Sequence, residues 1–145
     1  MIEVFFRFNK QDLISRIKKI SSISNRIIVS NLDGLSFINR LSRKKEDIFI
    51  YLDPPYYQKG ADLYMNFYSN TDHLNLAKRV HTLRNNWMVS YDRQEFILQL
   101  YSAHSKVSHR LSQSASNRVG DEIIIFSDDL EFLESIPALN SANII

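Results

Sequence analysis

The tetrapeptide Asp53-Pro54-Pro55-Tyr56 combines residue types that can bind and activate an amino group on an aromatic base. Such an amino group is a poor nucleophile because its lone pair is delocalised into the ring. Two acceptors on its two hydrogens favour a pyramidal nitrogen whose lone pair points at an electrophile. Asp53 offers a carboxylate, and Pro54 or Pro55 offers a backbone carbonyl whose position is restrained because proline fixes φ. Tyr56 adds a flat surface on which a base can stack.

The element before this tetrapeptide must position it. Residues 47–52 are nearly continuously apolar, which is typical of a strand buried on both faces at the centre of an α/β sheet. In open α/β sheets, ligands bind beyond the carboxyl ends of the strands, so the location of Asp53 predicts a site. The structural alternative is that the two prolines only end a strand and expose Tyr56.

The remaining pattern alternates strands with helices, which predicts an α/β fold with a largely parallel sheet. Predicted helices cover residues 9–22 with Asn9 as cap, 35–41, 71–84 with Thr71 as cap, and 94–101, and predicted strands cover 26–30, 87–91, 106–111 and 122–126. The apolar face of the first helix is expected to pack. No helix is evident between the last two strands, so we expect them to form an antiparallel hairpin. One domain over residues 1–136 and a loose tail over 137–145 are predicted.

Composition excludes several classes of function. The 145 residues contain no cysteine, which rules out disulfides, thiolate zinc sites and cysteine nucleophiles, and the 4 histidines show no ligand spacing, so no metal is assigned. No apolar run reaches the ~20 residues of a membrane span, and the start is unlike a signal peptide, so a cytoplasmic protein is expected. The only 3 glycines, Gly34, Gly60 and Gly120, are far apart, so no glycine-rich nucleotide turn is present.

A longer block around the tetrapeptide resembles the Dam-like adenine-specific DNA methyltransferases, with their Asp-Pro-Pro-Tyr motif. The block is Ile50-Tyr51-Leu52-Asp53-Pro54-Pro55-Tyr56-Tyr57, then residues 59–66, Asp72-His73 and residues 87–92, in the family's order and spacing. Residues 7–9 and 26–33 resemble the segment leading to the family's third strand. The likeness extends roughly over residues 6–126, and it implies a partial Rossmann-like methyltransferase sheet.

The resemblance also implies an activity: site-specific transfer of a methyl group from S-adenosylmethionine to the exocyclic amino group of a flipped adenine in double-stranded DNA. It implies that Asp53 and a proline carbonyl, from Pro54 or Pro55, hold the amino group while Tyr56 stacks on the base. Asp33, with Asp53, would contact the cofactor, although Asp33 also suits a turn beside Gly34. The base pocket is expected to include Tyr57, Tyr64 and Asp92, with core packing or a turn as the alternatives, and Lys59 and Arg118 are candidate phosphate contacts.

The chain departs from that family in one respect. Neither the Phe-x-Gly-x-Gly-like turn that holds the methionine end of the cofactor nor a target-recognition region precedes the catalytic motif. The sequence therefore resembles the carboxyl-terminal catalytic half of such an enzyme. Two interpretations stay open. The first is a DNA adenine methyltransferase, or its catalytic half with a second polypeptide as a candidate source of the missing glycine-rich half. The second is a non-catalytic truncated remnant or split-enzyme subunit that binds nucleic acid or a partner chain. Uncovered sheet edges would favour self-association.

Overall fold

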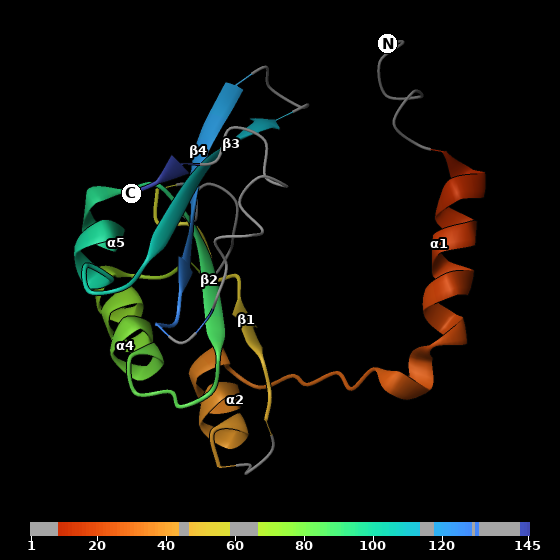
Figure 1. Ribbon diagram of the computed structural model, residues 1–145. Coiled ribbons are helices and arrows are strands. Elements are labelled where there is room, and N and C mark those ends of the chain that lie inside the picture. Colours follow the sequence, from red (N-terminus) through yellow and green to blue (C-terminus); the bar gives the residue numbers. More distant parts are fainter. Residues whose placement is uncertain (1–8, 44–46, 59–66, 114–117, 129, 131–142) are drawn as a thin grey trace. The chain divides into compact units, whose positions relative to one another are not determined.

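The computed structural model describes residues 9–43, 47–58, 67–113, 118–128, 130 and 143–145 (Figure 1). The chain divides into two compact units, Met1–Phe37 and Ile38–Ile145, and each is described by itself. Within the described residues, no helix combines the length and the apolar character needed to cross a membrane.

The first unit contains helix α1 (Lys10–Ser22) and a 3-10 turn, η1 (Ser24–Arg26). As predicted, Asn9 caps α1, and its Oδ1 accepts a hydrogen bond from the backbone N–H of Asp12 at 3.1 Å. Within this unit the apolar face of α1 does not pack, because Leu13, Ile17 and Ile20 are all exposed there.

The strand predicted over residues 26–30 is wrong, because residues 27–30 form no regular structure and Ile28 and Val29 are 94% and 88% exposed. β-branched residues favour strands by packing on a half-buried sheet, and no described strand pairs with this run. The run continues into helix α2 (Gly34–Leu41), which agrees with the prediction for residues 35–41.

The second unit is built on a sheet with strand order β1-β2-β4-β3-β5. Its strands are β1 (Ile50–Leu52), β2 (Trp87–Asp92), β3 (Lys106–Gln113), β4 (Arg118–Phe126) and β5 (Asn143–Ile144). The predicted hairpin is confirmed, since β3 and β4 pair antiparallel. The expectation of a largely parallel sheet is wrong for the described strands, because β1 and β2 pair in parallel and the other pairings are antiparallel. The prediction of a loose tail over residues 137–145 is wrong at its end, because β5 pairs with β3.

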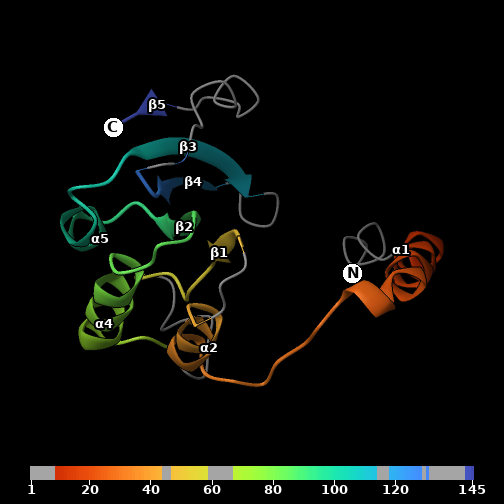
Figure 2. The ribbon, with the colours of Figure 1, turned by 60° about the horizontal axis from the view of Figure 1, so that its bottom comes forward.

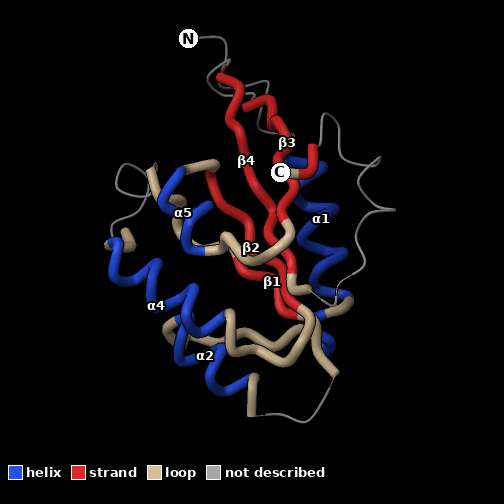
Figure 3. The backbone as a smooth tube through the Cα atoms, turned by 60° about the vertical axis from the view of Figure 1, so that its left-hand side comes forward, coloured by secondary structure: helices blue, strands red, loops and turns tan. Residues whose placement is uncertain are grey.

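The strand before Asp53 is not central as predicted, because β1 lies at one edge of the described sheet. Ile50 is buried, whereas the neighbouring Tyr51 is 53% exposed. An apolar run gives the same pattern whether one or both of its faces are covered, and tyrosine and phenylalanine tolerate partial exposure. Figure 3 shows β2 between β1 and β4, so β2 takes the inner position.

Helices α4 (Asn70–Val80) and α5 (Glu95–Leu100) lie on the same side of the sheet (Figure 2). The cap of α4 is Ser69, not Thr71 as predicted, because Ser69 and Asp72 form a reciprocal capping box. The helices contribute buried residues to a core with the inward-facing residues of β2 and β4; this core includes Leu76, Ala77, Val80, Val89, Tyr91, Ile97, Ile123 and Ile125.

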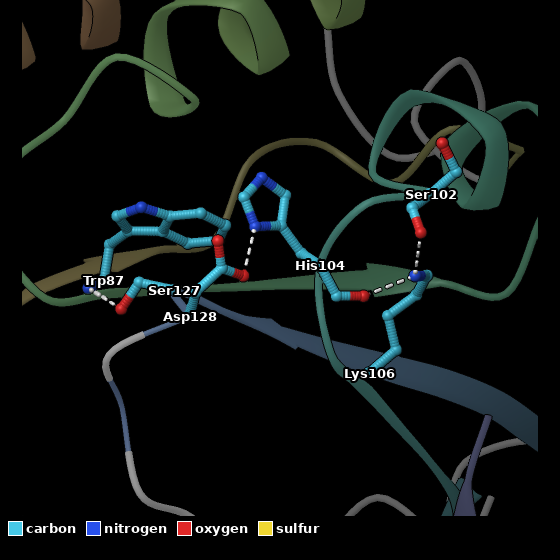
Figure 4. A network of polar contacts seen from close by, with 6 residues as sticks. All are labelled: Trp87, Ser102, His104, Lys106, Ser127 and Asp128. Carbon is cyan, nitrogen blue, oxygen red and sulfur yellow. Dashed lines mark hydrogen bonds and ion pairs between the residues drawn. The ribbon is translucent and has the colours of Figure 1, made fainter.

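Hydrogen bonds fasten the amino-terminal end of β2, which is the end away from Asp53 (Figure 4). The Trp87 backbone N–H donates to Ser127 Oγ at 3.2 Å, and the Ser127 N–H donates to the Trp87 carbonyl at 3.0 Å. The Lys106 ammonium donates to backbone carbonyls just after α5, and burial lowers the pKa of this lysine. The Trp87–Ser127 pair joins β2 to the residue that follows β4, and the Lys106 bonds join β3 to the loop after α5.

Candidate active site

Asp53 follows β1 directly and lies beside the last residues of β2. Its side chain is exposed, and Oδ1 accepts a hydrogen bond from Ser90 Oγ at 2.9 Å. Ser90 Oγ also lies 3.0 Å from the Tyr51 hydroxyl. A serine has one hydroxyl proton, and Ser90 donates it to Asp53, so Tyr51 is the donor of the second bond. The Tyr51–Ser90–Asp53 chain therefore orients the carboxylate.

Tyr56 is held at its hydroxyl, which donates to Glu122 Oε1 at 2.7 Å. Burial, followed by the hydrogen bond and the charge of Glu122, raises the pKa of Tyr56. The hydroxyl therefore stays protonated and acts as a donor at neutral pH. Glu122 is a contact of the motif that the sequence pattern does not predict, and the one signal for it is an acidic residue at the start of the apolar run of β4.

Asp92 is only 6% exposed, and its carboxylate holds the backbone just after Tyr56. Oδ1 accepts from the N–H of Tyr57 at 2.8 Å, and Oδ2 accepts from the N–H of Gln58 at 3.0 Å. Gln94 Nε2 donates to Gln58 Oε1 at 2.8 Å and adds a further link to this turn. Asp92 thus supports the motif from the neighbouring strand, and its contact with a base stays a prediction.

The Tyr57 ring lies in a cluster of aromatic side chains between the sheet and the helices. It stacks on Phe96 with ring centroids 5.1 Å apart and is tilted against His73 at 5.5 Å. His73 is fully buried, and its Nδ1 lies 3.0 Å from the Tyr91 hydroxyl. Burial lowers the pKa of His73, although the nearby charges of Asp92 and Asp72 act in the opposite direction. This arrangement favours the packing alternative for Tyr57.

The other predicted site residues are divided between the two units, and the contacts of each are described within its own unit. Asp33 lies in the first unit, where its Oδ1 accepts from the Ser36 N–H at 3.1 Å at the start of α2. Lys59 and Tyr64 lie outside the described residues, and of Arg118 only the backbone is described, paired with Gln113 at the start of β4. Over the described part of the chain, His, Asp and Glu side chains form no cluster of three that could hold a metal ion.

Three features therefore meet at the carboxyl end of β1: an exposed carboxylate that Ser90 orients, two prolines, and a tyrosine whose hydroxyl is bonded to Glu122. The carboxylate and a proline carbonyl can accept hydrogen bonds from a planar amino group, and the tyrosine offers a ring beside it.

The comparisons with known proteins agree with this chemistry. The model of the D12 class N6 adenine-specific DNA methyltransferase family matches residues 4–116, a range that includes Asp53, Tyr56, Ser90 and Asp92. A comparison with curated proteins gives no match. Because the family model spans most of the 145 residues, the chain belongs to the D12 class N6 adenine-specific DNA methyltransferase family.

Proposed function

We propose that this chain carries the base-binding and catalytic residues of a site-specific methyltransferase that modifies the exocyclic amino group of a flipped adenine in double-stranded DNA. The observation that supports this most strongly is the Ser90–Asp53 hydrogen bond, which fixes an exposed carboxylate in the motif that the family match covers.

Each motif residue has a distinct role in the proposal. Asp53 accepts a hydrogen bond from one amino hydrogen, and the carbonyl of Pro54, restrained together with Pro55, accepts the other. The two bonds strengthen as the nitrogen becomes pyramidal, so they stabilise the transition state more than the ground state. Tyr56 stacks on the base, which compensates part of the energy of taking it out of the duplex.

S-adenosylmethionine, when bound, supplies the electrophilic methyl group. The hydrogen-bond acceptors proposed for the cofactor suit only part of that molecule, since Asp33 and Asp53 can accept from its hydroxyl or amino groups. No glycine-rich turn occurs in the sequence to let the backbone approach its methionine end. We therefore propose that a second polypeptide supplies this turn. Lys59 and Arg118 are proposed to contact DNA phosphates, and Tyr64 to border the base.

The substitution Asp53→Ala tests the proposal. The chain is mixed with a glycine-rich amino-terminal half of a D12-class enzyme, and transfer of radiolabelled methyl groups to adenine-rich duplex DNA is measured. Loss of a charge-assisted hydrogen bond of ~2–3 kcal/mol at the transition state predicts a fall of about two orders of magnitude in rate.

The matched control is Asp47→Ala, which removes an exposed carboxylate before β1 and should retain the wild-type rate. A wild-type rate in Asp53→Ala would show that the motif is structural. Absence of transfer by every preparation would favour the non-catalytic alternative.

A further inference from the structure

Three polar residues of β2 and β4 share one face of the sheet. Ser90 and Asp92 are two residues apart in β2, so their side chains point to the same side, and Glu122 of β4 is the direct partner of Asp92. Each contacts the segment after β1: Ser90 binds Asp53, Glu122 binds Tyr56, and Asp92 binds the backbone of residues 57 and 58. We call Asp92 and Glu122 the acidic pair.

The acidic pair is unfavourable for folding taken alone. Acidic side chains directly opposite each other on neighbouring strands repel, and Asp92 and Glu122 are only 6% and 9% exposed. The hydrogen bonds from Tyr56 and from the two backbone amides offset this cost. Two apolar residues at these positions would stabilise the fold without any such hydrogen bonds. The contacts of the acidic pair therefore point to a role in fixing the segment after β1.

The geometry restrains Tyr56 from both sides. Its backbone is followed at once by the two amides that Asp92 holds, and its ring is tied at the far end by the 2.7 Å bond to Glu122. A tyrosine ring fixed at both ends has little rotational freedom left to lose when a base stacks on it.

We propose that Glu122 is a positioning residue for methyl transfer, which holds the Tyr56 ring in place for the target base while Asp92 fixes the adjoining backbone. This inference rests on the proposed function. Glu122 lies beyond residues 4–116, the range that the family model matches, so the proposal makes the carboxyl-terminal hairpin a part of the site.

The test is a double-mutant cycle on the full chain with Tyr56→Phe, Glu122→Ala and the double variant. Tyr56→Phe keeps the stacking ring and removes the hydroxyl. Urea denaturation measures the folding equilibrium constant, and methyl transfer is measured as kcat and KM in the preparation described above. Circular dichroism confirms that each variant is folded under the assay conditions.

We expect a coupling of about tenfold in the folding equilibrium constant, and a fall of about tenfold in kcat/KM for each single variant with no further fall in the double variant. Glu122→Gln, whose amide oxygen still accepts from the phenol, should restore most of the rate. The control Glu95→Gln makes the same change on the exposed start of α5 and should leave the rate unchanged.

Two results would overturn the proposal: additive effects of the two substitutions on stability, or folded Glu122→Ala with wild-type kcat and KM. If the wild-type chain transfers no methyl group in any preparation, the proposed function fails. In that case the denaturation cycle still tests the contact between Tyr56 and Glu122, because additive effects on stability would show that the two residues are not coupled.

Discussion

At the scale of single residues, the motif after β1 is organised by side chains that are distant in sequence. Ser90 donates a hydrogen bond to Asp53, and Glu122 accepts one from the Tyr56 hydroxyl. Asp92 accepts hydrogen bonds from the backbone amides that follow Tyr56. Preorganisation of this kind matters because groups that are already in place cost no reorganisation when the reaction occurs.

The buried His73 gives a prediction about pH. Burial lowers its pKa in the folded chain, so the unfolded chain binds a proton more readily. The free energy of unfolding should therefore be highest above the histidine pKa of the unfolded chain, ~6.5, and should fall as pH decreases through that pKa. Urea denaturation between about pH 7.5 and about pH 5.5 should show this loss of stability, and His73→Gln should make the loss smaller.

The pKa of His81 is lowered as well, by burial and by the nearby His104, so some pH dependence should persist in His73→Gln. His81→Gln is the matched control and should remove a separate part of the slope. An unchanged slope in His73→Gln would mean that protonation of His73 is not resisted by its surroundings.

At the scale of elements, local signals located most helices and strands, and contacts between elements decided their environment. The residue patterns of α1, α2, α5 and the hairpin predicted the elements that the structure contains. They did not predict that β1 lies at the edge of the described sheet, because the sequence of a strand does not specify whether other strands pair with one or both of its edges.

The start of α4 gives a test in which sequence and structure disagree. Ser69 Oγ donates to Asp72 Oδ2 at 2.6 Å and accepts from the Asp72 N–H at 3.3 Å, whereas the sequence favoured Thr71 as the cap. Ser69→Ala should lower the free energy of unfolding by ~1 kcal/mol, because a helix N–H loses its acceptor.

Thr71→Ala serves as the control for this substitution. Because Thr71 is exposed in the first turn of α4, its replacement should change stability by less than the loss of the cap. Thermal or urea denaturation of both variants decides, and the reverse order of effects would restore Thr71 as the cap.

At the scale of the whole molecule, we predict that these 145 residues by themselves bind S-adenosylmethionine weakly or not at all and do not methylate duplex DNA. The reason is the lack of a glycine-rich turn, since Gly34, Gly60 and Gly120 are isolated from one another. Calorimetric titration with the cofactor, together with a radiolabelled methyl-transfer assay, measures both properties.

Addition of a glycine-rich amino-terminal half should restore binding and transfer, and Asp53→Ala in the same mixture should show binding without transfer. Micromolar binding with turnover by the chain alone would instead identify it as a complete minimal enzyme.

The sequence by itself indicated the class of enzyme and predicted the catalytic tetrapeptide at the end of β1, because Asp53-Pro54-Pro55-Tyr56 is contiguous and its residue types act locally. The tertiary structure decided what holds that tetrapeptide. Ser90 and Glu122 lie far from it along the chain, and only the parallel pairing of β1 with β2 and the antiparallel pairing of β2 with β4 bring their side chains to it. Strand register is a property of two segments at once, so a pattern within either segment cannot specify it.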